Sequence, residues 1–304
     1  MAKAREIKRR IRSIDNTRQI TKTMEMVAAS KLKRAQDRVV AARPFDEFMR
    51  QVIVHVREGA TDELADFPLL RSSVASGRVG VLVVTSNRGL AGAFNANLVK
   101  AARAHMKGLR AEGKEIELHV IGKKGASMLR YLGDTPERTI VDLPDRPSYE
   151  DAGALAEPLI EAFREERLDA VYLVYSLFKS PVEQRPVVAQ ILPLPGRGEI
   201  GEAEAARPRD EESERRYEPV YEFLPSPSAI LGQLLPLFLR YGVYRAVSES
   251  AASEHGARRT AMRNATDNAK ELIRSLTRSY NRARQAQITQ EIAELVGGSE
   301  ALRG

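Results

Sequence analysis

Apolar residues recur with a helical period over two long segments, one near each end of the chain. In residues 4–43 they fall on a strict heptad grid whose members are mostly apolar or small. The grid consists of Ile7, Ile11, Ile14, Arg18, Thr21, Glu25, Ala28, Leu32, Ala35, Val39 and Ala42. A seven-residue repeat sustained over this length predicts a helix that forms a left-handed supercoil with a partner helix. Pro44 is expected to kink or end this helix.

The segment from Ser253 to Val296 carries a matching pattern. Its repeat alternates between spacings of three and four residues and consists of Met262, Thr266, Ala269, Ile273, Leu276, Tyr280 and Ala283. This spacing predicts the seam of a second paired helix. Beyond Ala283 the same positions are polar, and the apolar residues move to Ile288, Ile292 and Leu295. We therefore expect this helix to leave its partner near Arg284-Gln285 and to end at Gly297-Gly298.

Small residues and prolines indicate how the two helices pair and where the second one begins. Small residues recur in both repeats, which lets the helices approach closely. Ser226-Pro227 predicts the start of the second helix, because proline is favoured at the first helical position, and Pro236 is expected to bend it. At 1.5 Å per residue, roughly 60–70 helical residues reach on the order of 100 Å. Since the two helices lie at opposite ends of the chain, the prediction is a long antiparallel coiled coil.

Between the two helical segments the pattern changes to short, often β-branched runs separated by helical stretches. The predicted strands are residues 79–84, 117–121, 170–176 and 187–192, the last an edge strand flanked by Pro186 and Pro193. The predicted helices are residues 93–112, 123–131 and 150–166. Strands that alternate with helices indicate a small Rossmann-like α/β domain.

The chain is thus expected to be an α/β protein with four parts. Residues 1–58 form the N-terminal long helix, residues 75–195 the α/β domain, and residues 226–297 the C-terminal long helix that pairs with the first. Residues 196–225 are acidic and rich in loop-forming residues, which indicates a linker.

Composition excludes several classes of protein. The chain has 304 residues, is 43% hydrophobic and 29% charged, and has no apolar run near the roughly 20 residues that span a bilayer. This argues against an integral membrane protein. The basic N-terminus has no apolar core and is not expected to be a secretory signal. Because the chain has no cysteine, disulfides, thiolate metal sites and thiol-based switching are excluded.

The net charge of +7 is concentrated in one element. Residues 1–43 hold thirteen Lys or Arg and four Asp or Glu, so they carry +9 and the remainder carries −2. A basic helix of this kind can bind a phosphate backbone, which makes a basic coiled-coil nucleic-acid-binding protein the alternative hypothesis. It can equally dock on an acidic protein surface or form a solvated helix face.

Residues with the chemistry of an active site are sparse. The loop of residues 86–92 lies between a predicted strand and a helix, where phosphates often bind. It matches neither G-x-G-x-x-G nor G-x-x-x-x-G-K-[ST], so we interpret it as a connector. The four histidines show no metal-ligand spacing. We expect no catalytic residues, no cofactor and no metal, and keep a nucleotide-using α/β enzyme as a second alternative.

Three groups of residues resemble the γ subunit of F-type ATP synthases. They are the run from Ile14 to Lys31, residues 86–95 (SNRGLAGAFN), and two motifs near the C-terminus, namely residues 261–262 with 265–269 (ATDNA) and residues 280–291 (YNRARQAQITQE). The resemblance covers essentially the whole chain in the same order. It implies a non-catalytic central rotor that turns inside the hexamer of alpha and beta subunits. Such a rotor couples proton or sodium flow to ATP synthesis or hydrolysis.

The resemblance also implies where the chain works and which residues meet its partners. It implies contacts of the α/β domain with the epsilon subunit and the membrane c-ring, on the cytoplasmic face of the bacterial plasma membrane, with no nucleic acid and no small-molecule substrate. The residues that it places against the catalytic ring are Lys22, Met24, Met26, Arg88, Ala91, Arg284, Gln285, Thr289 and Glu291. Lys22 and Arg284 would pair with acidic loops, while Gln285 and Thr289 would offer hydrogen bonds.

Overall fold

The computed structural model of this chain describes residues 2–59, 69–70, 76–144, 146–194 and 227–301. The chain divides into two compact units. Residues 1–29 and 258–304 make up the helix-pair unit, and residues 30–257 make up the sheet unit. The acidic linker predicted over residues 196–225 lies outside the described residues.

Two long helices contribute to both units. Helix α1 spans Ala2–Gly59 and helix α6 spans Pro227–Ala301, so the predicted start of the second helix is confirmed. The possibility that Pro44 would end α1 is wrong, because the helix continues through it, as α6 does through Pro236. A proline removes one N–H from the helical ladder, and the hydrogen bonds on either side remain.

The expected end of the second helix at Gly297-Gly298 is also wrong, because α6 continues to Ala301. A glycine lowers helix stability by about 1 kcal/mol relative to alanine but does not forbid the helical conformation. None of the described helices combines the length and the apolar character that crossing a membrane requires.

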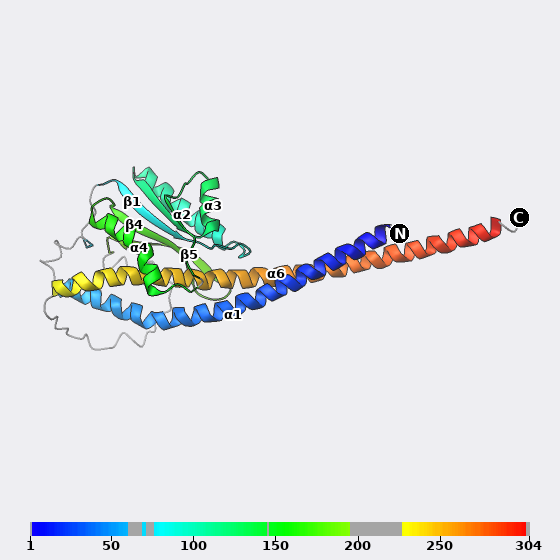
Figure 1. The fold of residues 1–304 in the computed structure, drawn as a ribbon, viewed down its shortest axis with the longest axis horizontal. Helices are drawn as coiled ribbons and strands as arrows, with labels where there is room; N and C mark the ends of the chain where they lie inside the picture. The colour runs from blue at the N-terminus through cyan, green and yellow to red at the C-terminus, as the bar shows by residue number, and fades with distance from the viewer. Residues whose placement is uncertain (1, 60–68, 71–75, 145, 195–226, 302–304) are drawn as a thin grey trace. The chain divides into compact units, whose positions relative to one another are not determined.

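In the helix-pair unit the first part of α1 and the last part of α6 run side by side in opposite directions (Figure 1). Burial follows the predicted seam of α6. Met262, Thr266 and Ala269 are buried, and Ile273, Leu276, Tyr280 and Ala283 are half-buried. On α1, Thr21 and Ala28 are buried. The predicted antiparallel coiled coil is therefore confirmed.

The sheet unit contains a five-stranded sheet in the order β3-β2-β1-β4-β5. The strands are β1 (Arg78–Val84), β2 (Glu115–Ile121), β3 (Arg138–Ile140), β4 (Ala170–Phe178) and β5 (Gln184–Leu192). The first four are parallel, and β5 pairs antiparallel with β4 at the edge. The four predicted strands are confirmed. The sequence pattern does not predict β3, because a run of three residues shows no recognisable period.

Helices cover both faces of this sheet (Figure 1). Helices α2 (Phe94–Ala111) and α3 (Lys123–Tyr131) pack on one face, while α4 (Tyr149–Arg164) and the first part of α6 pack on the other. Successive residues of β1 point to opposite faces. Val83 packs in the core beneath α2 and α3, and Leu82 in the core beneath α4 and α6. These layers confirm the predicted Rossmann-like α/β domain.

Candidate functional site

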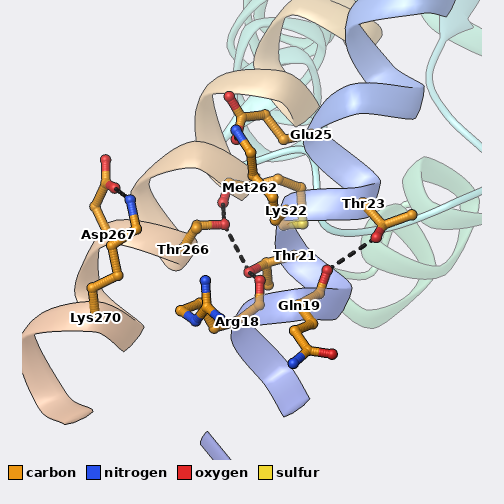
Figure 2. Close-up of polar contacts among 10 residues, drawn as sticks. All are labelled: Arg18, Gln19, Thr21, Lys22, Thr23, Glu25, Met262, Thr266, Asp267 and Lys270. Atoms are coloured by element: carbon orange, nitrogen blue, oxygen red, sulfur yellow. Dashed lines mark hydrogen bonds and ion pairs between the residues drawn. The ribbon is translucent and has the colours of Figure 1, made fainter. Parts of the chain in front are cut away.

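A buried hydrogen bond joins the two helices of the helix-pair unit. The hydroxyl oxygens of Thr21 and Thr266 lie 2.8 Å apart, and both side chains are buried (Figure 2). Each hydroxyl also contacts a carbonyl oxygen of its own helix, that of Arg18 at 3.0 Å and that of Met262 at 2.8 Å. A threonine hydroxyl can donate once and accept twice, so the pair satisfies itself inside the seam. The contact fixes the register of α1 against α6.

This register determines where α6 runs out of partner helix. Ala2, the first described residue of α1, lies nineteen residues before Thr21, and Gln285 lies nineteen residues after Thr266. Because both helices rise by the same distance per residue, the described part of α1 reaches along α6 to about Gln285. The remainder of α6, residues 286–301, extends beyond it by roughly 24 Å (Figure 1).

Apolar side chains on this overhang are exposed. The exposed fraction is 44% at Ile288, 57% at Ile292 and 74% at Leu295. These three residues, which we call the tip stripe, share one face of the helix because they are four and three residues apart. The prediction that the apolar stripe leaves its partner helix near Arg284-Gln285 is confirmed. A contiguous apolar stripe that no described element covers is typical of a surface that meets another protein.

The contact residues predicted on the two helices fall into two separate groups. Around the Thr21–Thr266 contact, Lys22 pairs with Glu25 at 3.2 Å, Met24 is half-buried and Met26 is 55% exposed. The second group lies where the overhang begins, and its members Arg284, Gln285, Thr289 and Glu291 are all exposed. The register separates the two groups by on the order of 30 Å along the helix axis.

In the sheet unit, the loop after β1 is held in place by its own polar side chains. The Asn87 side chain donates to the carbonyl oxygen of Val141 at 2.9 Å and accepts from the amide of Lys123 at 3.0 Å. The Asn95 amide group contacts the backbone and the hydroxyl of Ser86 at 3.0 and 2.8 Å. These polar groups lie at the carboxyl end of β1, where phosphates often bind, and they bond within the protein instead.

The fixed loop presents an exposed leucine in an unusual conformation. Leu90 has a φ of 63° and is 64% exposed. Positive φ is uncommon for residues other than glycine, and such strain clusters at functional sites. Arg88 is exposed, whereas Ala91 is only 2% exposed and belongs to the core beneath α2. Arg88 and Leu90 therefore lie on the outer surface of the loop, and Ala91 anchors it from inside.

Comparisons with known proteins agree with these features over the full length. The family model described as ATP synthase matches residues 3–302. The ATP synthase gamma chain of Gemmatimonas aurantiaca is 48% identical over 305 residues, with 100% of both chains covered. The chain belongs to the ATP synthase gamma chain family. The gamma chain of Heliobacterium modesticaldum is 42% identical, with 98% of both chains covered.

Solved structures share the fold of this gamma-chain family member. A chain from the central stalk and c-ring structure of the Tetrahymena thermophila mitochondrial ATP synthase has 25% identity and a TM-score of 0.57, covering 81% of this chain and 99% of that one. A chain from the Euglena gracilis mitochondrial ATP synthase has 21% identity and a TM-score of 0.64, covering 99% of this chain and 95% of that one. The resemblance found in the motifs is confirmed, and nothing in these matches supports the nucleic-acid-binding alternative.

One group of possible metal ligands in the sheet unit was not foreseen from the sequence. Glu117, His119 and Glu137 each place a ligand atom within 4.8 Å of the others. The Arg78 guanidinium lies 3.5 Å from Glu117 and 3.8 Å from Glu137, and His119 contacts Glu117 at 3.0 Å. Because a cation is already built into this group, we interpret it as an ion-pair network that ties β1 and β2 to the residues before β3.

Two further features of the gamma chain were not singled out in the sequence. Thr21 and Thr266 both occupy predicted seam positions, but their contact depends on a register that neither repeat specifies alone. The exposure and positive φ of Leu90 are the second feature. The nearby Gly92 is the residue that points to a tight turn here, and it also has a positive φ of 56°.

Proposed function

We propose that this chain is the rotor of the central stalk of an F-type ATP synthase. It turns inside the hexamer of alpha and beta subunits and couples proton or sodium flow through the membrane c-ring to ATP synthesis or hydrolysis. Its other partner is the epsilon subunit, and the complex holds it peripherally on the cytoplasmic face of a bacterial plasma membrane. Membership of the gamma chain family supports this proposal, as do structural neighbours from a central stalk and from a rotor of mitochondrial ATP synthases.

The observation that carries the proposal is the overhanging end of α6. Residues 286–301 extend beyond the described part of α1 and expose the tip stripe. Apolar surface left in water costs about 25 cal/mol per Å², so covering this stripe with another protein stabilises the complex. A ring of subunits around the overhang covers the stripe in every orientation of the helix, which suits a part that rotates.

The predicted contact residues take distinct roles in this proposal. Lys22 and Arg284 pair with acidic loops of the catalytic ring, Gln285 and Thr289 form hydrogen bonds, and Met24, Met26 and Glu291 complete the two helix surfaces. In the sheet unit Arg88 forms the loop contact, which Ala91 supports from the core. A rotor couples catalytic sites only if its contact energies differ between orientations. Side chains of different chemistry on different faces supply that asymmetry.

In this proposal the chain itself catalyses nothing, and the alternative is a nucleotide-using α/β enzyme. The loop after β1 supports a non-catalytic chain, because its Asn87 and Asn95 side chains form hydrogen bonds within the protein. Calorimetric titration of the full-length chain separates the two hypotheses. We expect no saturable binding of ATP or NAD at physiological concentrations. Micromolar binding that Arg88→Ala abolishes would favour the enzyme.

Rotation in the assembled complex tests the proposed function. The chain has no cysteine, so Tyr131→Cys introduces a single thiol at a side chain that is 89% exposed. A bead attached to this thiol should turn continuously in one direction when the hexamer is fixed to a surface and ATP is added. A complex that turns over ATP while the bead stays still would contradict the proposal.

A cross-link provides a second test with its own control. Leu90→Cys is preferred to Ala91→Cys, because Leu90 is 64% exposed and Ala91 is buried. A disulfide from this thiol to a cysteine on the facing catalytic-subunit loop should stop ATP turnover at every site, since all sites share one rotor. Reduction should restore it, and Leu90→Cys alone should stay active under oxidising conditions. Full turnover with the cross-link complete would contradict rotation.

A further inference from the structure

The order of strands creates a point in the sheet unit where similar folds bind ligands. The chain proceeds from β1 to β2 and β3 on one side of β1, and then returns to β4 on its other side. In open α/β sheets, ligands bind beyond the carboxyl ends of the strands at such a reversal. The last pair that joins β1 to β4 is Val83 with Val174, while β4 continues to Phe178. The final residues of β4 therefore have no β1 neighbour.

Helix α6 takes the place of that missing neighbour. Ser250 accepts a hydrogen bond from the amide of Ser176 at 2.9 Å, and Ser253 donates to the carbonyl oxygen of Ser176 at 3.1 Å. The amide of Phe178 donates to the Glu249 carboxylate at 3.4 Å. All five residues are buried. Ser176 and Phe178 are alternate residues, so their backbone groups project from the same edge of the strand.

The opposite edge of β4 agrees with this geometry. Ser176 lies opposite Pro186 of β5. In an antiparallel pair, directly opposed residues either exchange two hydrogen bonds or none. Because the backbone groups of Ser176 bond to α6, its pair with Pro186 is of the second kind, and the missing N–H of Pro186 costs the ladder nothing. This explains how Pro186 lies inside β5, although the sequence pattern predicts it at the flank of the strand.

Apolar packing accompanies these hydrogen bonds. The Phe178 side chain lies in a buried cluster with residues of both long helices, namely Leu32, Ala35, Val39 and Ala252. Close approach of the β4–β5 turn to α6 also depends on Gly256. A Cβ atom there would lie 3.1 Å from the side-chain nitrogen Nε2 of Gln184 and 3.3 Å from the Pro181 carbonyl oxygen. The end of β4 is thus seated against α1 and α6 at once.

We propose that Glu249, Ser250 and Ser253 form a clamp in which the chain's own long helix occupies the ligand position of the α/β domain. The clamp fixes this domain to α6, so that torque passes between the domain and the helix through the end of β4. Hydrogen bonds suit this task better than apolar contacts, because they are directional. A slip of the helix along β4 leaves buried backbone groups of Ser176 without partners, which opposes sliding. The torque part rests on the proposed function, whereas the clamp itself does not.

Amide hydrogen exchange of the full-length chain tests the clamp. Ser250→Ala combined with Ser253→Ala should speed exchange at the amide of Ser176 by about tenfold, as expected for the loss of a buried hydrogen bond. Ser248→Ala is the matched control, because Ser248 is 3% exposed on the same helix and its hydroxyl has no hydrogen-bond partner within the described structure. Ser250→Thr keeps a hydroxyl and should retain the protection of the Ser176 amide. This variant gives a result even if the double variant fails to fold. The clamp would be overturned if the Ser176 amide were protected as well in the double variant as in Ser248→Ala. It would also be overturned if Ser250→Thr lost that protection.

The torque part is tested in the assembled complex. We expect the double variant to hydrolyse ATP while pumping fewer ions per ATP than the wild type, and Ser248→Ala to pump normally. The opposite outcome is a double variant whose Ser176 amide exchanges quickly but which pumps as many ions per ATP as the wild type. That result would overturn torque transfer through the clamp and leave the rotor proposal intact. If the wild-type complex itself does not rotate, the proposed function fails while the exchange result still decides the clamp.

Discussion

The two units of this gamma chain bury their side chains in opposite ways. In the sheet unit, two apolar clusters fill both faces of the sheet, and large side chains such as Phe163 and Leu82 are fully buried. In the helix-pair unit, the buried positions include small or polar residues such as Thr21, Ala28 and Thr266, while Ile20 and Met26 are 60% and 55% exposed. The sheet unit is stabilised from within, and the helix pair keeps apolar surface for partners.

The largest difference should come from deleting one large side chain in each unit. Phe163→Ala removes a 0%-exposed ring from the sheet unit and should cost about 3–5 kcal/mol. Leu272→Ala removes a side chain of the helix-pair unit that is 49% exposed and should cost less than about 1 kcal/mol. Urea unfolding of the full-length chain measures both. Similar losses in the two variants would mean that the helix pair has a core of its own.

Overpacking tests the seam at two positions that belong to different units. Ala28 lies in the helix-pair unit and Ala35 in the sheet unit, at 2% and 0% exposure. Replacement of either by phenylalanine should cost roughly 1–3 kcal/mol. Ala35→Phe should be the worse, because its site is enclosed by the cluster around Phe178.

Arg34→Phe is the control for this pair, since Arg34 is exposed beside the seam. It should change the melting temperature much less than the other two. Equal thermal stability of all three variants would remove the assignment of Ala28 and Ala35 to a close helix contact.

The same contrast explains how far the sequence could predict the fold. Periodic apolar positions average over many residues, so the coiled-coil seam and the bounds of α3 were predicted correctly. Rules that rest on one residue were weaker. Pro44 and Gly297 each lower helix stability locally, yet the hydrogen bonds around them continue the helix.

The candidate site was predicted in the same uneven way. The motifs identified the family and the break in the stripe near Arg284, because both are properties of long runs. They did not predict that Ala91 is buried while Leu90 is exposed, since the direction of a loop side chain depends on contacts with distant residues. Asn87 in this loop, for example, bonds to Val141 and Lys123, which lie 54 and 36 residues away in the sequence.

Removing the cross-helix hydrogen bond should have a smaller effect than overpacking. Thr21→Val leaves the Thr266 hydroxyl in the seam with the Met262 carbonyl oxygen as its remaining contact. Each single valine variant should cost about 1 kcal/mol. The double variant should cost less than the two single losses together, because either single change already removes the shared contact between the hydroxyls.

Thr21→Ser is the control, because it keeps the hydroxyl and loses only a methyl group. A double-mutant cycle from chemical unfolding measures the coupling between the two threonines. Strict additivity would show that the contact between their hydroxyls contributes nothing to pairing.

The smallest effect should be a difference in acid sensitivity between the two units. In the sheet unit, burial alone would raise the pKa of Asp134, but hydrogen bonds from Arg103 and Arg110 at 2.7 and 2.8 Å outweigh it and lower that pKa. In the helix-pair unit, a hydrogen bond from Lys270 lowers the pKa of Asp267, whose side chain is 55% exposed.

A carboxylate whose pKa is lower in the folded state stabilises the protein above the unfolded pKa of about 3.9, and this contribution is lost as pH falls through the folded pKa. Wild-type stability should therefore fall on acidification below about pH 5, and Asp134→Asn should make this fall shallower. Asp267→Asn should leave the slope near that of the wild type, because water and salt screen exposed pairs. Unfolding free energies measured against pH at low and high salt provide the comparison. If Asp267→Asn flattened the profile as much as Asp134→Asn, the helix pair would depend on its surface charges as strongly as the sheet unit depends on its buried ones.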